Sequence, residues 1–307
     1  MRILILGGSG YLGFALANYL SDFFKVTLCT RSIKRVKSLQ KKCLIIKSNY
    51  FNFKELKKTI KGHDVVIHCV GMSSAQLIKN NSGLELKKKI TKNIVMACNY
   101  HNVKKLIYFS SIKVYQDYEN LKIINEKSKI DNKAKIYSKS HVEAEKIIIS
   151  KDNKINYLII RLASIFGFNV LQNIGEQSNT IVNNLCKTLV LQKKIKIKNP
   201  NIVRNFLPMS IFLKNIKKII NKNQKYNIVN MGYKTLSLFD LSLLISKCYT
   251  KITKKKIKYY FSNKNKKKIN FFKYKSLFIK NAYKKMIFTS EIKDMINIYK
   301  DKYDKGI

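Results

Sequence analysis

The chain has 307 residues, which is enough for one large α/β domain or for a domain with a smaller lobe. Its hydrophobic residues (46%) and aromatic residues (11%) can fill such a core, which excludes a disordered chain or a small disulfide-held protein. The 62 Lys+Arg against 17 Asp+Glu give a formal net charge of +45.

This charge alone is typical of proteins that bind nucleic acid or acidic membranes. Only five of the 62 basic residues are arginine, although arginine makes the commonest bidentate contacts with bases and phosphates. Lys, Asn and Ile, which have A/T-rich codons, are abundant, whereas Gly and Pro are scarce. We therefore attribute the lysine excess to an A+T-biased genome and expect no specific nucleic-acid partner. Selection for polyanion binding is the alternative.

The six cysteines form no C-x-x-C pair, and most lie in apolar runs, which indicates buried thiols in a reducing compartment. The four histidines lack metal-ligand spacing, so we expect no metal. No run approaches the roughly 20 apolar residues that span a bilayer, and the apolar run at residues 3–6 is too short for a signal peptide. These features predict a cytoplasmic protein without a membrane partner.

Short apolar runs alternate with amphipathic segments in the first half of the chain. Strands are expected at residues 3–6, 25–29, 43–47, 64–69, 105–110 and 156–162, and helices at 11–20, 53–61, 88–101 and 137–150. Such alternation predicts βαβ units and a parallel sheet covered by helices on both faces. The predicted fold class is therefore α/β, a doubly wound parallel sheet of the Rossmann type with a smaller C-terminal substrate-binding lobe.

The pattern loosens after residue 166. Helices are expected at 180–192, 211–220 and 236–249, a strand at 226–231, a return to the main sheet at 204–208 and a solvated lysine-rich loop at 251–270. We assign residues 1–166 to a dinucleotide-binding domain, with 202–230 returning to it. Residues 167–201 and 231–307 are assigned to the substrate-binding lobe.

The first strand leads directly into a glycine loop, residues 7–13, with the spacing G-x-x-G-x-x-G. Glycine permits a sharp turn and a close approach of backbone to a pyrophosphate, and the following helix N-terminus offers free N–H groups. A tight turn without a ligand is the alternative, but the flanking strand and helix favour dinucleotide binding. The predicted cofactor contacts in this loop are Gly7, Gly10, Tyr11, Leu12 and Gly13.

The end of the second strand carries Thr30 and Arg31 where NAD-specific folds place an Asp or Glu for the adenosine ribose. Arg31 could bind a 2′-phosphate, so we expect the cofactor to be NADP or NAD, with NADP favoured. Arg31 could also be an ordinary surface charge, and Thr30 could still bind a ribose.

Over nearly its whole length the chain resembles the extended short-chain dehydrogenases/reductases of the nucleotide-sugar epimerase/dehydratase family. Besides the glycine loop, the segments that carry the resemblance are residues 64–71, 108–115, 160–167, 204–208 and 226–232. The first of these resembles the strand whose end lies near the nicotinamide ribose, which implies cofactor contacts from Cys69, Val70 and Gly71. The second resembles the strand that delivers the active-site Ser or Thr, here Ser111.

The resemblance implies that Tyr137 is the catalytic acid/base. A phenol with a pKa near 10 becomes a base at neutral pH only if a nearby cation favours the phenolate. The family has a lysine four residues later, where this chain has His141, while Lys139 lies on the other side of the helix. A protonated imidazole could do part of the lysine's work. The alternative is a weakened or inactive site.

Two further departures concern residues near this site. Lys87 occupies the position of the family's Asn in the helix before the serine strand. Ile112 and Lys113 occupy the positions of the Asp-Glu pair with which the family's dehydratases eliminate water. Neither can act as a carboxyl acid or base, so dehydration is not expected.

For the substrate, the resemblance implies that Arg204 approaches the diphosphate of a nucleotide sugar. Ser73 and Ser74 are candidates for sugar or pyrophosphate contacts, although each could equally be a hydroxyl that caps a loop. His68 is expected to be a packed strand histidine. Relatives pair as two-fold dimers through the helices at 88–101 and 137–150, which implies a homodimer, with Val142, Ile148 and Ile149 offering apolar surface.

The function that the resemblance implies is an NAD(P)-dependent epimerase or ketoreductase acting on a nucleotide-diphosphate sugar. The residues do not decide between these two reactions. The alternative, based on His141 and on the charge, is a non-catalytic Rossmann scaffold that binds a dinucleotide or RNA.

Overall fold

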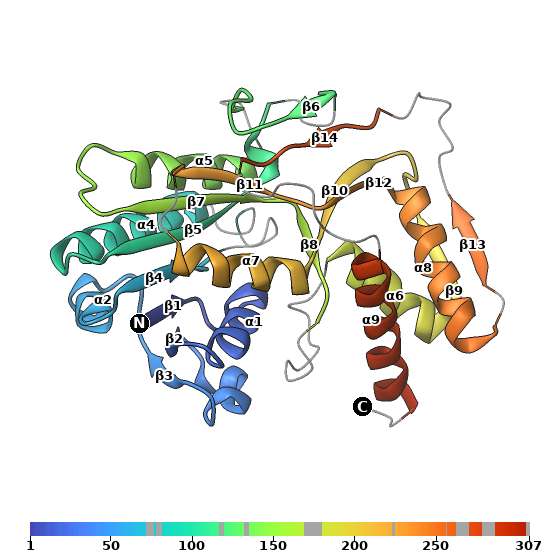
Figure 1. The fold of residues 1–307 in the computed structure, drawn as a ribbon, viewed down its shortest axis with the longest axis horizontal. Helices are drawn as coiled ribbons and strands as arrows, with labels where there is room; N and C mark the ends of the chain where they lie inside the picture. The colour runs from blue at the N-terminus through green and yellow to red at the C-terminus, as the bar shows by residue number, and fades with distance from the viewer. Residues whose placement is uncertain are drawn as a thin grey trace.

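The computed structural model describes residues 1–71, 77, 82–116, 120–131, 135–168, 180–222, 225–255, 257–261, 270–277 and 286–304. In these residues a large parallel sheet is flanked by helices, and a second group of helices and short strands lies beyond one end of the sheet (Figure 1). This arrangement confirms the predicted Rossmann-type α/β fold.

The main sheet pairs all its described strands in parallel. Their spatial order is β11 (Ile228–Met231), β7 (Tyr157–Leu162), β5 (Lys105–Ser111), β4 (Val65–His68), β1 (Arg2–Leu6), β2 (Lys25–Thr30) and β3 (Leu44–Lys47). The order reverses at β1, which has β4 on one side and β2 on the other. In open parallel sheets, ligands bind beyond the carboxyl ends of the strands at such a switch point.

Helices cover both faces of this sheet. One face carries α1 (Tyr11–Leu20), η1 (Ile33–Leu39) and α7 (Met209–Asn221), and the other carries α2 (Phe53–Ile60), α4 (Gly83–Tyr100) and α5 (Ile136–Ile149). Because successive strand residues point to opposite faces, β1 sends Ile3 and Ile5 to the first core and Leu4 and Leu6 to the second. Both faces are buried, which explains the almost continuous apolar runs of these strands.

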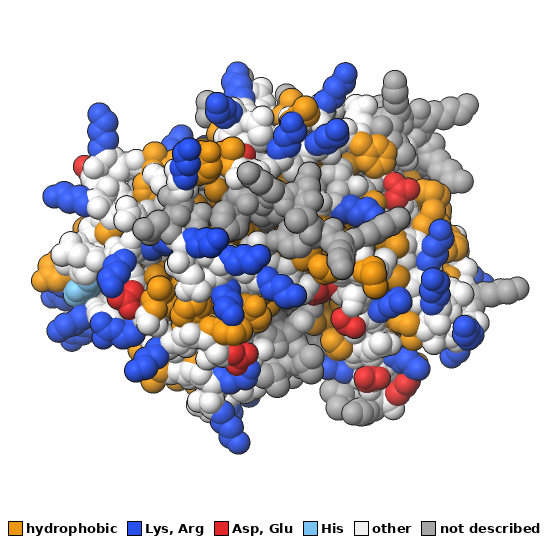
Figure 2. All heavy atoms as spheres, viewed as in Figure 1, with side chains coloured by type: hydrophobic (Ala, Val, Ile, Leu, Met, Phe, Trp, Pro, Cys, Tyr) orange, Lys and Arg blue, Asp and Glu red, His pale blue; other side chains and the backbone are white. Residues whose placement is uncertain are grey.

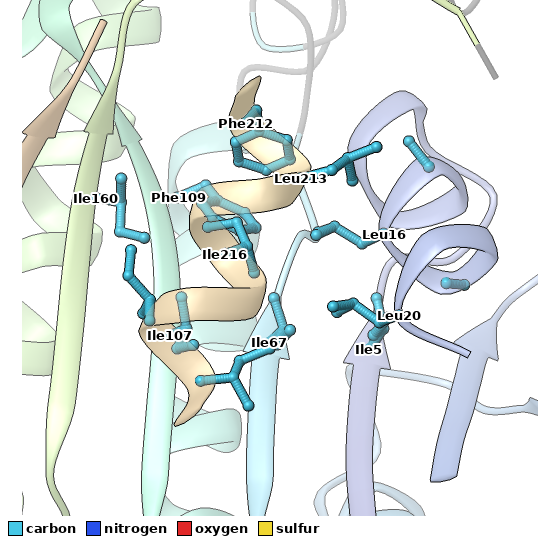
Figure 3. Close-up of a cluster of buried hydrophobic side chains, with 14 of the residues drawn as sticks. Ile5, Leu16, Leu20, Ile67, Ile107, Phe109, Ile160, Phe212, Leu213 and Ile216 are labelled. Carbon is cyan, nitrogen blue, oxygen red and sulfur yellow. The ribbon is translucent and has the colours of Figure 1, made fainter. Parts of the chain in front are cut away.

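Figure 3 shows the core under α7. The rings of Phe109 on β5 and Phe212 on α7 meet edge to face, with their centroids 5.2 Å apart. Leu213, also on α7, lies toward Leu16 of α1 (Figure 3). α7 therefore packs on the middle of the sheet and on α1 together.

The second group of elements has a core of its own, formed by α6 (Ile181–Gln192), α8 (Leu238–Thr253) and α9 (Met286–Asp304) with the parallel pair β9 (Lys194–Ile197) and β13 (Lys258–Phe261). A three-stranded sheet of β12 (Lys234–Ser237), β10 (Val203–Pro208) and β8 (Ser164–Phe166) joins it to the main sheet. β7 continues into β8, so the carboxyl ends of the parallel strands face this lobe (Figure 1).

Three segments differ from the expectation. Residues 204–208 lie in β10, which pairs with β8 and β12, so the chain returns to the main sheet with α7, which packs on its face, and then with β11, which joins it as a strand. The stretch expected as a lysine-rich loop includes the end of α8 and the strand β13, whose Tyr259 and Tyr260 are exposed and give no alternating pattern. α9 is absent from the expected elements, although its buried residues have helical spacing.

Lysine and arginine side chains are spread over the face shown in Figure 2, on both the Rossmann part and the second lobe. All six cysteines are free thiols, and Cys29, Cys98, Cys186 and Cys248 are buried. In the described part of the chain, no helix is long and apolar enough to cross a bilayer, and no cluster of His, Cys, Asp and Glu could hold a metal ion.

Candidate functional site

The glycine loop begins with a close backbone approach. Gly7 has a φ of +93°, and a Cβ atom there would lie 2.8 Å from the backbone carbon of Cys69 at the end of β4. The N–H groups of Gly7 and Gly8 both donate to the carbonyl of Cys29 at the end of β2, at 3.1 and 2.9 Å. Only glycine fits the position of Gly7, because both its φ and the space around it exclude a side chain.

The loop leaves the first turn of α1 open. Gly10 is the N-cap residue and offers no side-chain cap, and the first turn contains no acidic residue. A Cβ atom on Gly13 would lie 2.4 Å from the carbonyl oxygen of Gly7, so the helix packs directly on the turn. The first-turn N–H groups of Tyr11, Leu12 and Gly13 have no acceptor within the helix, and they can donate to an anion. These residues fit the pyrophosphate of a dinucleotide.

Two tyrosines support the loop. The buried phenol of Tyr50 accepts a hydrogen bond from the N–H of Gly7 at 3.0 Å and donates to the carbonyl of Cys29 at 2.8 Å. Its role was missed from the sequence, because only the pairing of β2 with β3 brings Tyr50 under the loop. The phenol of Tyr11 donates to the carbonyl of Gly167, at the start of the second lobe. The phenol of Tyr11 is therefore engaged within the protein, while its backbone N–H stays open to a ligand.

At the end of β2, Thr30 is buried and Arg31 is exposed. Thr30 is fully buried, and its hydroxyl accepts from the N–H of Ser32 at 3.2 Å, so this hydroxyl holds the turn. Arg31 is exposed at the strand's end and is close enough to Tyr50 to lower the pKa of that phenol, against a larger rise caused by burial. Arg31 is therefore an exposed cation that directly follows β2, whose carbonyl at Cys29 holds the glycine loop.

The end of β4 lies beside the glycine loop, and the N–H of Cys69 donates to the carbonyl of Leu6 at 2.9 Å. The next residue, Val70, donates its N–H to Nδ1 of the buried His68 at 3.2 Å. Gly71 is exposed, and a Cβ atom there would meet no atom of the described residues within 4 Å, so packing does not explain this glycine. Ser73 and Ser74 lie outside the described residues.

His68 is a neutral packing residue. Since Nδ1 accepts a hydrogen bond, the proton is assigned to Nε2, which lies 3.3 Å from the hydroxyl of Thr91. That hydroxyl donates to the carbonyl of Lys87 at 2.9 Å. Burial lowers the pKa of His68 to about 3, and the charge of Lys87 contributes to that shift. His68 therefore links β4 to α4.

The structure brings Tyr137, Ser111 and His141 together. Ser111 ends β5, Tyr137 lies in the first turn of α5, and His141 follows one turn later. The rings of Tyr137 and His141 meet edge to face, with centroids 4.9 Å apart. Burial raises the pKa of the Tyr137 phenol above 10, and a hydrogen bond with Ser111 partly offsets this rise. Lys139 is exposed, as its place on the helix implies.

His141 is neutral in this environment. It is buried, and its Nδ1 shares a 2.9 Å hydrogen bond with the phenol of Tyr108. Burial lowers the pKa of His141 well below 6.5, and the charges of Lys87 and Lys113 add to the effect. The imidazole therefore does not supply the positive charge of a protonated histidine, because its protonated form is unfavourable among these groups at neutral pH.

Tyr108, Lys87 and Lys113 complete this cluster. The register of β4 and β5 pairs His68 with Tyr108, and Lys87 lies with its Nζ 5.6 Å from the centroid of the Tyr108 ring. Nζ of Lys113 lies 5.3 Å from the centroid of the Tyr137 ring. Helical spacing could have identified Lys87 as buried, because it shares a face of α4 with Ile90, Thr91 and Ile94.

Arg204 is half-buried and lies in β10. Its neighbour Val203 packs in a small core with Ile112 and Val142, which adjoin Ser111 and His141. Nε of Arg204 is buried and has no hydrogen-bond partner among the described residues. A buried guanidinium donor without a partner is suited to an anionic ligand.

The model of the NAD dependent epimerase/dehydratase family matches residues 3–232. A curated zebrafish (Danio rerio) protein, short-chain dehydrogenase/reductase family 42E member 1, is 32% identical over 114 residues. That match covers 36% of this chain and only 29% of the zebrafish protein's length.

Two solved structures show the same fold over nearly the whole chain. UDP-N-acetylglucosamine 4-epimerase from Methanobrevibacter ruminantium, in complex with UDP-N-acetylmuramic acid, has a TM-score of 0.80 at 18% identity, covering 98% of both chains. A mutant of UDP-glucuronic acid 4-epimerase from Bacillus cereus, in complex with a fluorinated UDP-sugar and NAD, has a TM-score of 0.77 at 17% identity, covering 99% of this chain and 100% of that one.

We predict that His141 makes the protein less stable in acid. Its folded-state pKa lies below its ordinary value of 6.5, so the unfolded chain binds the proton first and unfolding is favoured as the pH falls below about 6.5. His141→Gln should reduce the pH dependence of the unfolding free energy by about 1.4 kcal/mol per pH unit between pH 6 and 5. Urea unfolding at several pH values measures this slope.

Tyr108→Phe is the matched control, because it removes the hydrogen bond to His141 and retains the buried imidazole. It should lower the unfolding free energy by about 1–3 kcal/mol while keeping the acid slope. An unchanged slope in His141→Gln would show that this imidazole is not buried in its neutral form.

Proposed function

The chain belongs to the NAD dependent epimerase/dehydratase family, and we propose that it is an NAD(P)-dependent epimerase or ketoreductase that acts on a nucleotide-diphosphate sugar. The observation that carries this proposal is Tyr137 beside Ser111 at the carboxyl end of β5, on the sheet edge where the glycine loop leaves β1. In this proposal, residues 1–166 and the returning α7 and β11 bind the dinucleotide, and the second lobe binds the sugar.

When bound, the dinucleotide supplies or accepts a hydride. In the epimerase reaction Tyr137 takes the proton of a sugar hydroxyl as its carbon is oxidised, and returns it when the keto group is reduced from the other face. In the ketoreductase reaction Tyr137 donates its proton to the oxygen of the reduced keto group. Ser111 holds the reacting oxygen by a hydrogen bond, and it already interacts with the phenol of Tyr137.

The substrate's diphosphate is assigned to Arg204, whose buried Nε lacks a described partner. An arginine fork suits two phosphate oxygens. Ser73 and Ser74, by their place after β4, are proposed to contact the sugar or the pyrophosphate. Gly7, Gly10 and Gly13 shape the loop for the dinucleotide, with Cys69, Val70 and Gly71 beside it.

Turnover tests the function directly. Purified protein is incubated with UDP-, GDP- and dTDP-sugars in the presence of NAD(H) or NADP(H), and the reaction is followed by nicotinamide absorbance and by chromatography of the sugars. We expect one of these sugars to be epimerised, or its keto form reduced. Tyr137→Phe should abolish this turnover and leave dinucleotide affinity nearly unchanged, because only the ionisable oxygen is removed.

Tyr226→Phe is the matched control, because this tyrosine is 39% exposed and lies outside the cluster. It should retain full activity. Turnover by Tyr137→Phe at the original rate would reject Tyr137 as the acid/base. Absence of turnover in all conditions, with dinucleotide binding intact, would instead favour the non-catalytic scaffold.

We propose NADP as the favoured cofactor, because Arg31 lies exposed at the end of β2 in the place of a carboxylate. Titration should show tighter binding of NADPH than of NADH, and Arg31→Ala should remove most of the difference. Arg35→Ala, which removes an exposed arginine four residues later, serves as the control and should preserve the preference. Equal affinities in the unmodified protein would contradict this proposal.

We also propose a homodimer that pairs through α4 and α5. Val142 and Ile148, expected to offer apolar surface, are in fact buried, because they pack in the protein's own core. The exposed apolar residues on these helices are Met96, Tyr100 and Ile149.

Light scattering should therefore give about twice the chain mass of 35.8 kDa. Met96→Asp combined with Ile149→Asp should give monomers, because two charges would be buried at the interface. Met286→Asp, on an exposed site of α9, should leave the mass unchanged. A monomer mass for the unmodified protein at micromolar concentration would contradict the dimer.

A further inference from the structure

Lys87 is a buried lysine in the middle of the chain's candidate site. Its side chain lies on the buried face of α4, and only 4% of the residue is exposed. In the described part of the chain its ammonium group forms no ion pair, and it lies over the ring of Tyr108. Glu145, whose charge acts on Tyr108, is itself held by Arg161 through contacts of 3.1 and 2.7 Å. A buried charge without an opposite charge beside it is costly, and such charges concentrate at functional sites.

The rings of Tyr108 and His141 lie between Lys87 and Tyr137. Nζ of Lys87 lies 5.6 Å from the ring centroid of Tyr108, and the Tyr108 phenol is 2.9 Å from Nδ1 of His141. The His141 ring in turn lies 4.9 Å from the ring of Tyr137. The charge of Lys87 acts electrostatically on this cluster, since it lowers the pKa of both His68 and His141.

We propose that the ammonium group of Lys87 supplies the positive charge that favours the phenolate of Tyr137, a charge that position 141 on α5 does not provide. This inference rests on the proposed function, in which Tyr137 is the acid/base. Lys87 acts through space and through the Tyr108–His141 pair, so it is a positioning residue. Burial lowers the pKa of Lys87 to about 8, which leaves it mostly charged at neutral pH.

The ionisable groups around Lys87 and Tyr137 come from every element that packs there. They are His68 on β4, Tyr108 on β5, Lys113 on η2 (Ile112–Val114), and His141 and Glu145 on α5. Lys113 is the competing cation, with its Nζ 5.3 Å from the Tyr137 ring. It is half-buried, whereas Lys87 is buried, so water screens Lys113 more strongly.

The pH dependence of turnover distinguishes the loss of the Lys87 charge from a structural effect of the substitution. Lys87→Gln should move the acid limb of kcat upward by about one pH unit, so that the rate at pH 7 falls about tenfold and recovers at higher pH. Lys87→Arg, which keeps the charge, should retain the original limb. Lys89→Gln, on the exposed face of the same helix, should change nothing. A rate lowered equally at every pH, or a limb shifted by Lys113→Gln and not by Lys87→Gln, would overturn the proposal.

A second measurement does not need turnover. Protein labelled with ¹⁵N-histidine is titrated by NMR below pH 7, where Lys87 is charged, with His141→Gln giving the assignment. Lys87→Gln should raise the pKa of His141 by about one unit, while Lys89→Gln leaves it unchanged. This shift would support a charge at Lys87 within the cluster even if no sugar is turned over, whereas an unmoved His141 would reject the proposal.

A third test moves the positive charge from position 87 on α4 to position 141 on α5. His141→Lys alone should not raise the rate, because two ammonium groups would then be buried close together. Lys87→Asn alone should lose activity at neutral pH, and the double variant Lys87→Asn/His141→Lys should recover at least about tenfold over it. A gain from His141→Lys alone, or no recovery in the double variant, would show that Lys87 does not supply this charge.

Discussion

The close approach of Gly7 to the end of β4 is the constraint on which the site depends. With a φ of +93° and no room for a Cβ atom, Gly7 lets β1 turn away from the sheet immediately after its last residue. Its N–H and that of Gly8 are held by the carbonyl of Cys29, and Tyr50 supports the same turn. α1 can therefore begin directly above the sheet edge with its first N–H groups open toward a ligand.

The parallel sheet places the residues of the candidate site along one of its edges. Because its strands run in the same direction, the ends of β1, β4 and β5 bring the glycine loop, Cys69 and Ser111 to the same side. The packing of α4 against α5 adds a second layer beneath this edge, in which Lys87 and His141 approach Tyr108. The low polarity of this layer keeps both histidines neutral and leaves the lysine as the cation.

A buried polar network fixes the helix that carries Tyr137. Glu145, two turns farther along α5, forms a two-pronged ion pair with Arg161 of β7. Arg161 also donates to the phenol of Tyr115, which donates to Asn230 of β11 at 2.6 Å. Tyr274, on the short strand β14 (Lys273–Tyr274), donates to the carbonyl of Arg161 at 2.7 Å. Removing one member would leave a buried charge or donor unpaired, so this network holds α5 in one position over the sheet.

The sequence by itself determined the features that depend on near neighbours. The alternation of apolar runs indicated the parallel sheet, the glycine spacing placed the turn before α1, and a separation of four residues put Tyr137 and His141 on one helix face. Tertiary structure alone decided that His141 is neutral, that Lys87 points its charge into the same cluster, and that β10 joins a separate small sheet. The physical reason is that periodicity and turn geometry are local, whereas desolvation, the field of a charge and strand pairing depend on residues that meet only when distant segments pack together.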